Sequence, residues 1–563
     1  MLAWLQNPGW ILIGAGLIQP LLPYRLRAGL LVAAPAAAGA WLWSLPRPTL
    51  VTAELLGYTL TPLRLDPLAF VFALIFLIAA GLCGLFMLRV RGRLEPAASL
   101  VYAGAAVAAV LAGDLITLFV YWETTALASV LVILANGPGT YRVSLRYFLI
   151  QVTSGLLLMA GAIAYIRVTG DPGFGAIGLQ GLAGWLIFLA FGIKAAFPFL
   201  HNWLQNAYPA ASPTGTVVLS AFTTKLAIYA LARGYAGTDI LIPIGAVMTA
   251  FPIFYAVIEN DLRRVLAYSL NNQLGFMVVG VGIGTELSLN GTAAHAFTHI
   301  LYKALLFMTM GAVLLRAGTV KGSELGGLYK SMPWTAAFCI VGAASISAFP
   351  LFSGFISKSL ILSATAYQGA WIVWLVLLFA SAGVFHHSGI KIPFFAFFAH
   401  DSGIRCREAP WNMLLAMGIT AVLCIGLGCY PDPLYAILPY AVDYEPYTGG
   451  HVLTQMQLLL FSALAFTVLM RTGIYPPELR SVNLDFDWIY RRALPAAAAA
   501  ARNATVSARG ETIDTLCRLG DRAGHYLGRA FSAQGLLART TATSGMVAWV
   551  SLLLAAYLLF YYL

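Results

Sequence analysis

Residues 191–233 read FGIKAAFPFLHNWLQNAYPAASPTGTVVLSAFTTKLAIYALAR. The stretch holds two apolar runs of the kind that cross ~30 Å of hydrocarbon, yet Lys194 and Lys225 fall inside them. Pro198 follows Lys194 by four residues and should break or kink the helix there. Within a bilayer, a broken helix survives only where protein packs around it or where it lines water. The stretch therefore predicts a membrane helix bundle with buried charges beside helix breaks.

The rest of the chain has the composition of such a bundle. Of its 563 residues, 60% are hydrophobic and only 10% are charged, against roughly 25% in soluble globular proteins. A chain this apolar cannot cover its surface in water, so the bilayer must be its solvent. Apolar runs recur throughout and predict an all-α, polytopic transmembrane bundle of about 14–16 spans.

The composition also argues against several other classes of protein. No basic and aromatic residues interleave as they do in nucleic-acid-binding surfaces. The six cysteines form no C-x-x-C pair, so no zinc or iron–sulfur site is expected. The N-terminus MLAWLQNPGW lacks the basic start of a signal peptide, and its apolar run is interpreted as a retained first span. No cofactor or nucleotide motif is found, so the sequence predicts no enzymatic activity of its own.

The basic residues of the short connections indicate an orientation. Fourteen of them fall in alternate connections, and four fall on the opposite side: Arg47, Arg64, Arg167 and Arg233. The positive-inside rule then places the N-terminus outside the cell. Residues 471–544 fall on the arginine-rich, cytoplasmic side. They are interpreted either as an amphipathic helix along the membrane surface or as a disordered linker to a final span at 545–563.

The lysines are distributed quite differently from the arginines. The chain has seven lysines, and five of them fall within predicted spans: Lys194, Lys225, Lys303, Lys358 and Lys391. The arginines lie at span ends or in loops. A buried lysine can lose its proton, whereas an arginine effectively cannot. The pattern favours groups that exchange protons over groups that only supply fixed charge.

One carboxylate and three histidines accompany these lysines. Glu123 is the only acid within its span and is expected to pair with a buried lysine, either for transport or as a structural ion pair. HAFTHILYKALLF places His295, His299 and Lys303 four residues apart, so that they form one stripe on a helix. Histidines with this spacing can also bind a metal ion, but no third ligand is evident.

The later spans again combine a lysine with a preceding proline or histidine. SAFPLFSGFISK places Pro350 before Lys358, and FHHSGIKIPFF places His387 four residues before Lys391. Two readings remain for Lys358 and Lys391: they belong to the buried set, or they extend to a membrane interface.

From about residue 65 to 400, these motifs resemble the antiporter-like membrane subunits shared by respiratory complex I, membrane-bound hydrogenases and Mrp-type cation/proton antiporters. DLITLFVYWETTALASVLVI resembles the glutamate motif of the fifth helix in that family, and residues 191–233 resemble the seventh and eighth helices. NDLRRVLAYSLNNQLGFM, HAFTHILYKALLFM and LFSGFISK resemble the blocks that follow. YPAASPTGTVVLSAFTTKLAIYALAR and GIKIPFFAFFAHDSG look most like the D-type subunit of Mrp-type antiporters.

The resemblance implies a fold of two inverted five-helix repeats, each with a broken helix. The predicted organisation is then N-terminal helices (1–95), first repeat (96–235), second repeat (236–400), C-terminal helices (401–470), amphipathic segment (471–544) and final span (545–563). It also implies roles for single residues. Glu123 and Lys194 resemble the pair of the first half-channel, Lys225, His299 and Lys303 the central connection, and Lys358 the residue that links to the outside.

The implied function is ion translocation within a multi-subunit complex of a bacterial inner membrane. The resemblance leaves two alternatives: a subunit of a Na⁺/proton antiporter, or a proton-pumping subunit of a complex I-like oxidoreductase or membrane-bound hydrogenase. The expected partners are other membrane subunits, the lipid bilayer, protons and a monovalent cation.

Overall fold

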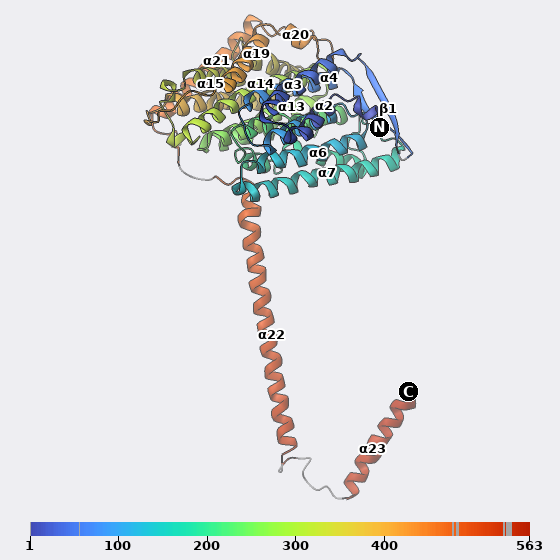
Figure 1. The fold of residues 1–563 in the computed structure, drawn as a ribbon. Coiled ribbons are helices and arrows are strands. Elements are labelled where there is room, and N and C mark those ends of the chain that lie inside the picture. Colours follow the sequence, from blue (N-terminus) through green and yellow to red (C-terminus); the bar gives the residue numbers. More distant parts are fainter. Residues whose placement is uncertain are drawn as a thin grey trace. The chain divides into compact units, whose positions relative to one another are not determined.

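The computed structural model describes residues 2–55, 57–475, 478–479, 483–532, 535 and 543–562. The chain divides into two compact units, Met1–Asp485 and Phe486–Leu563. Unit 1 is a bundle in which helices from all parts of the sequence pack side by side (Figure 1). This architecture confirms the predicted polytopic helical fold.

Unit 1 opens with the N-terminal helices α1 (Leu2–Leu5), α2 (Gly9–Ile18), α3 (Tyr24–Ser44) and α4 (Pro67–Phe86). A seven-helix set follows: α5 (Leu94–Val110), α6 (Leu115–Leu134), α7 (Tyr141–Thr169), α8 (Gly181–Ala195), α9 (Asn202–Ala207), α10 (Gly215–Ala221) and α11 (Thr223–Gly234). The next set is α12 (Leu241–Ile258), α13 (Leu262–Ile283), α14 (Glu286–Ala317), α15 (Pro333–Ile346), α16 (Ser353–Tyr367) and α17 (Trp371–Val384).

The remainder of unit 1 is the π-helical η5 (Phe385–Ile390), α18 (Lys391–Pro393), the π-helical η6 (Phe394–Phe398), α19 (Trp411–Cys429), α20 (Asp432–Tyr435) and α21 (Gly449–Arg471). Short 3₁₀ turns connect some of these helices: η1 (Gln19–Leu21), η2 (Pro138–Thr140), η3 (Gly322–Glu324) and η4 (Leu328–Lys330). Within the described residues, eleven helices are long and apolar enough to span a membrane, and four shorter apolar helices accompany them.

A β-hairpin was not predicted. Strands β1 (Thr49–Leu55) and β2 (Tyr58–Leu65) pair antiparallel between α3 and α4. The hairpin is tied to the start of α6, because the Thr61 N–H donates to Asp114 Oδ2 at 2.7 Å and Thr61 O accepts from the Gly113 N–H at 2.9 Å. Leu60, Leu63 and Leu65 are buried, so β2 is part of the core.

The same sequence of features occurs twice in unit 1. An aspartate caps the second helix of each set, because Asp114 accepts from the Thr117 N–H and Asp261 from the Arg263 N–H. Each of these aspartates also forms an isolated β-bridge to the loop after the third helix, with Gly173 in the first set and Lys321 in the second. The third helix ends each time in a left-handed glycine, Gly170 or Gly318. Both sets therefore have the same local design.

The helix breaks are also alike. AFPF at 196–199 follows α8, and AFPL at 348–351 follows α15. In each tetrapeptide the first and last residues have positive φ: 62° at Ala196, 70° at Phe199, 57° at Ala348 and 72° at Leu351. No other non-glycine residue among those described does so. A left-handed conformation costs an L-residue roughly 1–2 kcal/mol, so both breaks are strained. The predicted breaks near Pro198 and Pro350 are confirmed, and the second divides the predicted span 334–360 into α15 and α16.

The most deeply buried helices lie at the centre of unit 1. The described residues of α10 are all buried, as are all of α11 except Arg233, and nearly all of α13 and of α14 up to Val313. Helix α14 packs against α4, α10, α13, α15, α16 and α19. Polar side chains on these helices are therefore shielded from the surroundings by other helices.

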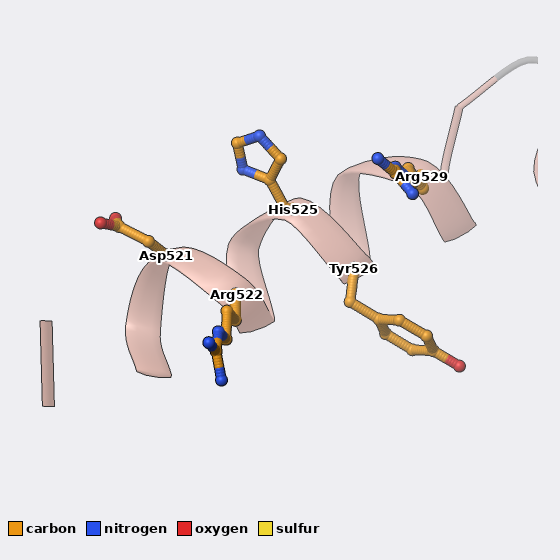
Figure 2. A pocket seen from close by; sticks show the side chains of 5 residues that line it. All are labelled: Asp521, Arg522, His525, Tyr526 and Arg529. Carbon is orange, nitrogen blue, oxygen red and sulfur yellow. The ribbon is translucent and has the colours of Figure 1, made fainter. Parts of the chain in front are cut away.

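Unit 2 contains the π-helical η7 (Ile489–Ala493), α22 (Leu494–Ala530) and α23 (Thr543–Tyr562). Helix α22 has 37 residues without interruption, so the linker interpretation is wrong for this part of 471–544. Its placement along a membrane surface stays a prediction. A surface hollow on α22 is lined by Asp521, Arg522, His525, Tyr526 and Arg529. These side chains fan out from one helix and do not converge on a common point (Figure 2), so they define no binding site.

The strain at the second break is testable with Ala348→Val. A β-branched side chain fits the left-handed region poorly, so we expect this variant to lose about 1–3 kcal/mol of stability, whereas Ala348→Gly should lose none. The measurement is the thermal unfolding of the purified protein. Ala343→Val is the matched control, because Ala343 is 4% exposed and helical while Ala348 is 3% exposed. Equal destabilisation by A348V and A343V would show that crowding, not backbone strain, is responsible.

Candidate functional site

The first lysine of the chain is Lys194, in the last turn of α8 immediately before the AFPF break. Its side chain is completely buried. The Nζ donates to Trp122 O at 2.7 Å and to Thr125 Oγ1 at 3.1 Å, and it lies 4.3 Å from the centroid of the Trp122 ring. Two hydrogen bonds and a cation–π contact therefore stabilise the ammonium in place of water.

Glu123 lies next to Trp122 on α6 and is only half-buried. It interacts electrostatically with Lys194, but its buried Oε1 has no hydrogen-bond partner. The carboxylate occupies a notch left by Gly155 of α7, where an added Cβ would overlap Oε1. The expected pairing of Glu123 with Lys194 is thus electrostatic, and the carboxylate is not held by hydrogen bonds at Oε1.

Hydroxyl groups lie between this pair and the next lysine. Ser129, one turn beyond Thr125 on α6, accepts from the Tyr147 hydroxyl of α7 at 2.9 Å. Tyr147 also interacts with Thr223, the first residue of α11. The Thr223 hydroxyl lies 2.5 Å from the hydroxyl of Tyr102, and its N–H donates to the same oxygen at 2.9 Å. Sequence reasoning missed these residues, although Thr125 and Ser129 stand four apart in an apolar span.

Lys225 follows directly after a break between α10 and α11. It is completely buried, and its Nζ donates to Ser220 O at 2.6 Å. Electrostatic interactions link it to His295, His299 and Lys303 on α14. Lys225 therefore stands where the hydroxyl cluster meets the histidines of the central helix.

The three α14 residues form the predicted stripe, and all are completely buried. His295 Nδ1 lies 3.0 Å from Ser357 Oγ on α16, and its ring centroid lies 6.0 Å from that of His299. Neither ring nitrogen of His299 has a hydrogen-bond partner. Lys303 donates to Ser269 Oγ of α13 at 2.8 Å. Within the described residues, no group of three or more His, Cys, Asp and Glu side chains is arranged to hold a metal ion.

Lys358 lies on α16, after the second break. It is 1% exposed, and its Nζ donates to Ile346 O at 2.7 Å. The ammonium also lies 5.3 Å from the centroid of the Phe276 ring. Lys391 is completely buried as well. The Lys358 side chain therefore belongs to the buried set, and the Lys391 side chain is buried close to one end of α12.

A chain of hydrogen bonds leads from the central helix to the π-helical turn η5. Lys303 donates to Ser269 Oγ, Ser388 donates to the same oxygen at 2.8 Å, and Ser388 Oγ lies 2.9 Å from His387 Nδ1. A π-helical turn places successive side chains at unusual angles and is frequent at functional sites. The two serines could not be found by charge or spacing, because serine is common in membrane helices.

The arrangement separates into two groups of charged residues. Glu123 and Lys194 interact with each other, whereas Lys225, His295, His299, Lys303, Lys358, His387 and Lys391 form a second, electrostatically connected group. The hydroxyls of Ser129, Tyr147, Thr223 and Tyr102 occupy the space between the two groups. Such an arrangement can hold and pass protons, because every member is a titratable group or a hydroxyl.

Comparison with known proteins agrees with this geometry. Residues 112–385 match the family described as NADH:quinone oxidoreductase/Mrp antiporter, transmembrane. The sequence is 30% identical over 351 residues to the D-type subunit of the Na⁺/H⁺ antiporter of Alkalihalophilus pseudofirmus, covering 58% of this chain and 71% of that protein. The chain belongs to this family. It is a multi-pass membrane subunit, as the apolar spans predict.

Other family members are associated with different complexes. Hydrogenase-4 component B of Escherichia coli is 28% identical over 414 residues, which cover 64% of this chain and 61% of that protein. A chain in the structure of the Mrp complex from Dietzia sp. DQ12-45-1b superposes with a TM-score of 0.74 at 25% identity, covering 98% of this chain and 62% of that one. This chain thus spans about three fifths of both proteins. The family relationship alone does not distinguish an antiporter from a redox-driven complex.

Proposed function

We propose that this chain is an ion-translocating membrane subunit of a multi-subunit monovalent cation (Na⁺)/proton antiporter, and that protons move along the buried Glu/Lys/His residues. The observation that carries the proposal is the set of five lysines buried inside the helix bundle. Lysine can release its proton in a buried site, whereas arginine keeps its own. The similarity to the D-type antiporter subunit supports the antiporter in particular.

The first step involves Lys194 and Glu123. A carboxylate beside a buried ammonium stabilises the charged lysine, so moving the carboxylate away favours release of the proton. Glu123 is suited to such a movement, because its Oε1 makes no hydrogen bond. The released proton passes to Thr125, which Lys194 already contacts at 3.1 Å, and on through the hydroxyl cluster to Lys225.

The central step involves the histidines. Lys225 interacts with His299, whose ring nitrogens are both without a hydrogen-bond partner, and His299 interacts with Lys303. A neutral imidazole accepts a proton at one nitrogen and releases one from the other, which is the usual role of histidine in a relay. Lys358 interacts with Lys303 and extends the path toward the second break.

A second candidate is a proton-pumping membrane subunit of a complex I-like oxidoreductase or a hydrogenase. Its support is the similarity to hydrogenase-4 component B. Under either function, the partners are other membrane subunits. The chain is located in a bacterial inner membrane, with the N-terminus outside and residues 471–544 on the cytoplasmic side. Identification of the chains that co-purify with this one distinguishes the candidates: small antiporter subunits in one case, iron–sulfur and quinone-binding subunits in the other.

Lys194→Arg tests the need for proton release. The variant keeps the charge, but its guanidinium does not lose a proton, so we expect an assembled complex whose transport falls at least tenfold. Proton flux is measured with a pH-sensitive dye in vesicles containing the purified complex. Lys330→Arg is the control, because Lys330 lies in a loop and is 45% exposed. Wild-type flux in an assembled K194R complex would exclude Lys194 as a proton carrier.

Two variants test Glu123. Glu123→Gln keeps the shape of the side chain without its charge, and we expect it to assemble but not to transport. Gly155→Ala should displace the carboxylate from its notch without removing it, and should slow transport several-fold. Gly426→Ala is the control, because its added Cβ meets no neighbour. Unchanged proton flux in E123Q would mean that Glu123 is only structural.

Tyr147→Phe tests the hydroxyl cluster. Removing this oxygen interrupts the contacts to Ser129 and Thr223, and we expect proton flux to fall about tenfold while the free energy of unfolding falls by only about 1 kcal/mol. Tyr141→Phe on the same helix is the control, because Tyr141 is 61% exposed. Equal flux in Y147F and Y141F would show that protons do not pass through this hydroxyl.

A further inference from the structure

The buried residues continue beyond Lys358 toward one end of α12. The hydrogen-bond chain from Lys303 through Ser269 and Ser388 reaches His387. His387 also interacts electrostatically with Lys391, one turn later. Its Nε2 has no hydrogen-bond partner. The next charged group on the path is therefore Lys391.

The Lys391 ammonium caps the C-terminal end of α12. Its Nζ donates to Val257 O at 2.6 Å and to Glu259 O at 2.7 Å. It also forms a salt bridge of 2.9 Å with Glu478 Oε1. Carbonyls at a helix C-terminus lack intrahelical partners and carry the negative end of the helix dipole, so an ammonium is stabilised there.

Two carboxylates face this lysine. The Glu478 side chain is 7% exposed, and the Glu259 side chain is 2% exposed. Glu259 interacts electrostatically with Lys391, and its Oε2 makes no hydrogen bond, although Arg264 Nη1 lies 3.6 Å away. Burial raises the pKa of the Glu478 carboxyl, and the Lys391 ammonium offsets part of that rise. Burial also raises the pKa of Glu259. The pKa of each carboxyl is thus raised above its ordinary value.

Glu478 comes from a part of the chain that the family match does not include. It lies in the post-α21 segment, of which residues 472–475, 478–479 and 483–485 are described. Asn483 of this segment donates to Ile258 O at 3.1 Å, and Asp485 pairs with His201 at 2.8 Å, with the side chains of that pair both buried. Asn483 and Asp485 are therefore held against α12 and the start of α9, and the salt bridge to Lys391 positions Glu478.

The cluster lies at the basic side of the bundle. Glu259 immediately follows α12 and lies three residues before the start of α13, whose first turn carries Arg263 and Arg264. An added Cβ on Gly322 would lie 3.4 Å from Glu478 Oε2. Gly322 follows Lys321, which, like Arg263 and Arg264, is one of the fourteen basic residues in the connections of the predicted cytoplasmic side. Leu479, beside Glu478, is 59% exposed, so the cluster is close to the protein surface.

We propose that Lys391, Glu478 and Glu259 form the portal through which protons pass between the buried residues and the cytoplasmic side. The proposal rests on the proposed function. A protonated Glu478 transfers its proton to the neutral Lys391 amine, which leaves a carboxylate and an ammonium in contact. The ammonium then gives the proton to a neutral His387, and Glu478 takes up another proton from water. Glu259 stabilises the intermediate ammonium.

The test compares Glu478→Gln and Glu478→Asp in the complete complex. For a portal, Glu478→Gln should assemble with an unchanged melting temperature while proton flux falls at least tenfold, and Glu478→Asp should recover part of the flux, because it restores a titratable group. Glu445→Gln, in an exposed loop, is the control and should transport normally. Wild-type proton flux in E478Q would overturn the proposed portal. A flux that falls only in proportion to the amount of assembled complex would also overturn it, and would show that Glu478 has only a structural role.

Two further measurements keep the outcome decisive. If E478Q does not assemble, the same criteria apply to Glu259→Gln, whose amide oxygen can still accept from the Asn260 N–H that Oε1 now binds. K194R and E123Q are measured in the same preparation. If these two lose transport while E478Q and E259Q do not, the portal is wrong and the proposed function stands. If all four transport normally, both are wrong.

Discussion

Every lysine buried in the helix bundle donates a hydrogen bond from its ammonium to a main-chain carbonyl, and the architecture of the bundle depends on these bonds. The pairs are Lys194 with Trp122, Lys225 with Ser220, Lys303 with Leu266, Lys358 with Ile346 and Lys391 with Val257. An unpaired charge at mid-membrane costs ~2.5–3.5 kcal/mol on insertion scales. In a regular helix, however, nearly every carbonyl is already used. Ser220, Ile346 and Val257 lie at breaks or helix ends, where carbonyls become free to accept.

This need for a free carbonyl gives a physical reason for the interruption after α15, because Ile346 at the end of that helix accepts from Lys358. The acceptor of Lys194, Trp122, lies within the continuous α6. The breaks after α8 and α15 each hold two non-glycine residues in the left-handed region, which is a cost that a continuous helix would avoid. In the first set, the strained Ala196 lies two residues after Lys194. In the second set, the strained Ala348 lies two residues after Ile346, whose carbonyl accepts from Lys358. Both sets therefore use a similar strained tetrapeptide, AFPF or AFPL, but the first places the lysine before the break and the second places it after.

Much of this architecture could be predicted from the sequence, because a bilayer leaves few choices. Long apolar runs must be helices, and a lysine inside one must be buried among protein groups. A proline can interrupt a helix, as at Pro198 and Pro350, although Pro35 and Pro252 lie within the continuous helices α3 and α12. The residues that were missed depend on packing between distant segments. Tyr147 and Ser269 matter because of where α7 and α13 lie, and Glu478 matters because the post-α21 segment returns to α12. The hairpin of β1 and β2 was missed because it lies in a short interval between spans.

The half-buried position of Glu123 has a consequence for the biogenesis of the complex. The bundle leaves part of the Glu123 side chain uncovered, although its Oε1 is buried, so a copy of this chain alone in a bilayer brings a polar side chain close to hydrocarbon. Another chain that covers this edge removes that cost. An orphan copy is therefore the less stable form, and it is the one that a membrane protease should degrade first, so the partial exposure of Glu123 favours assembly with a covering chain.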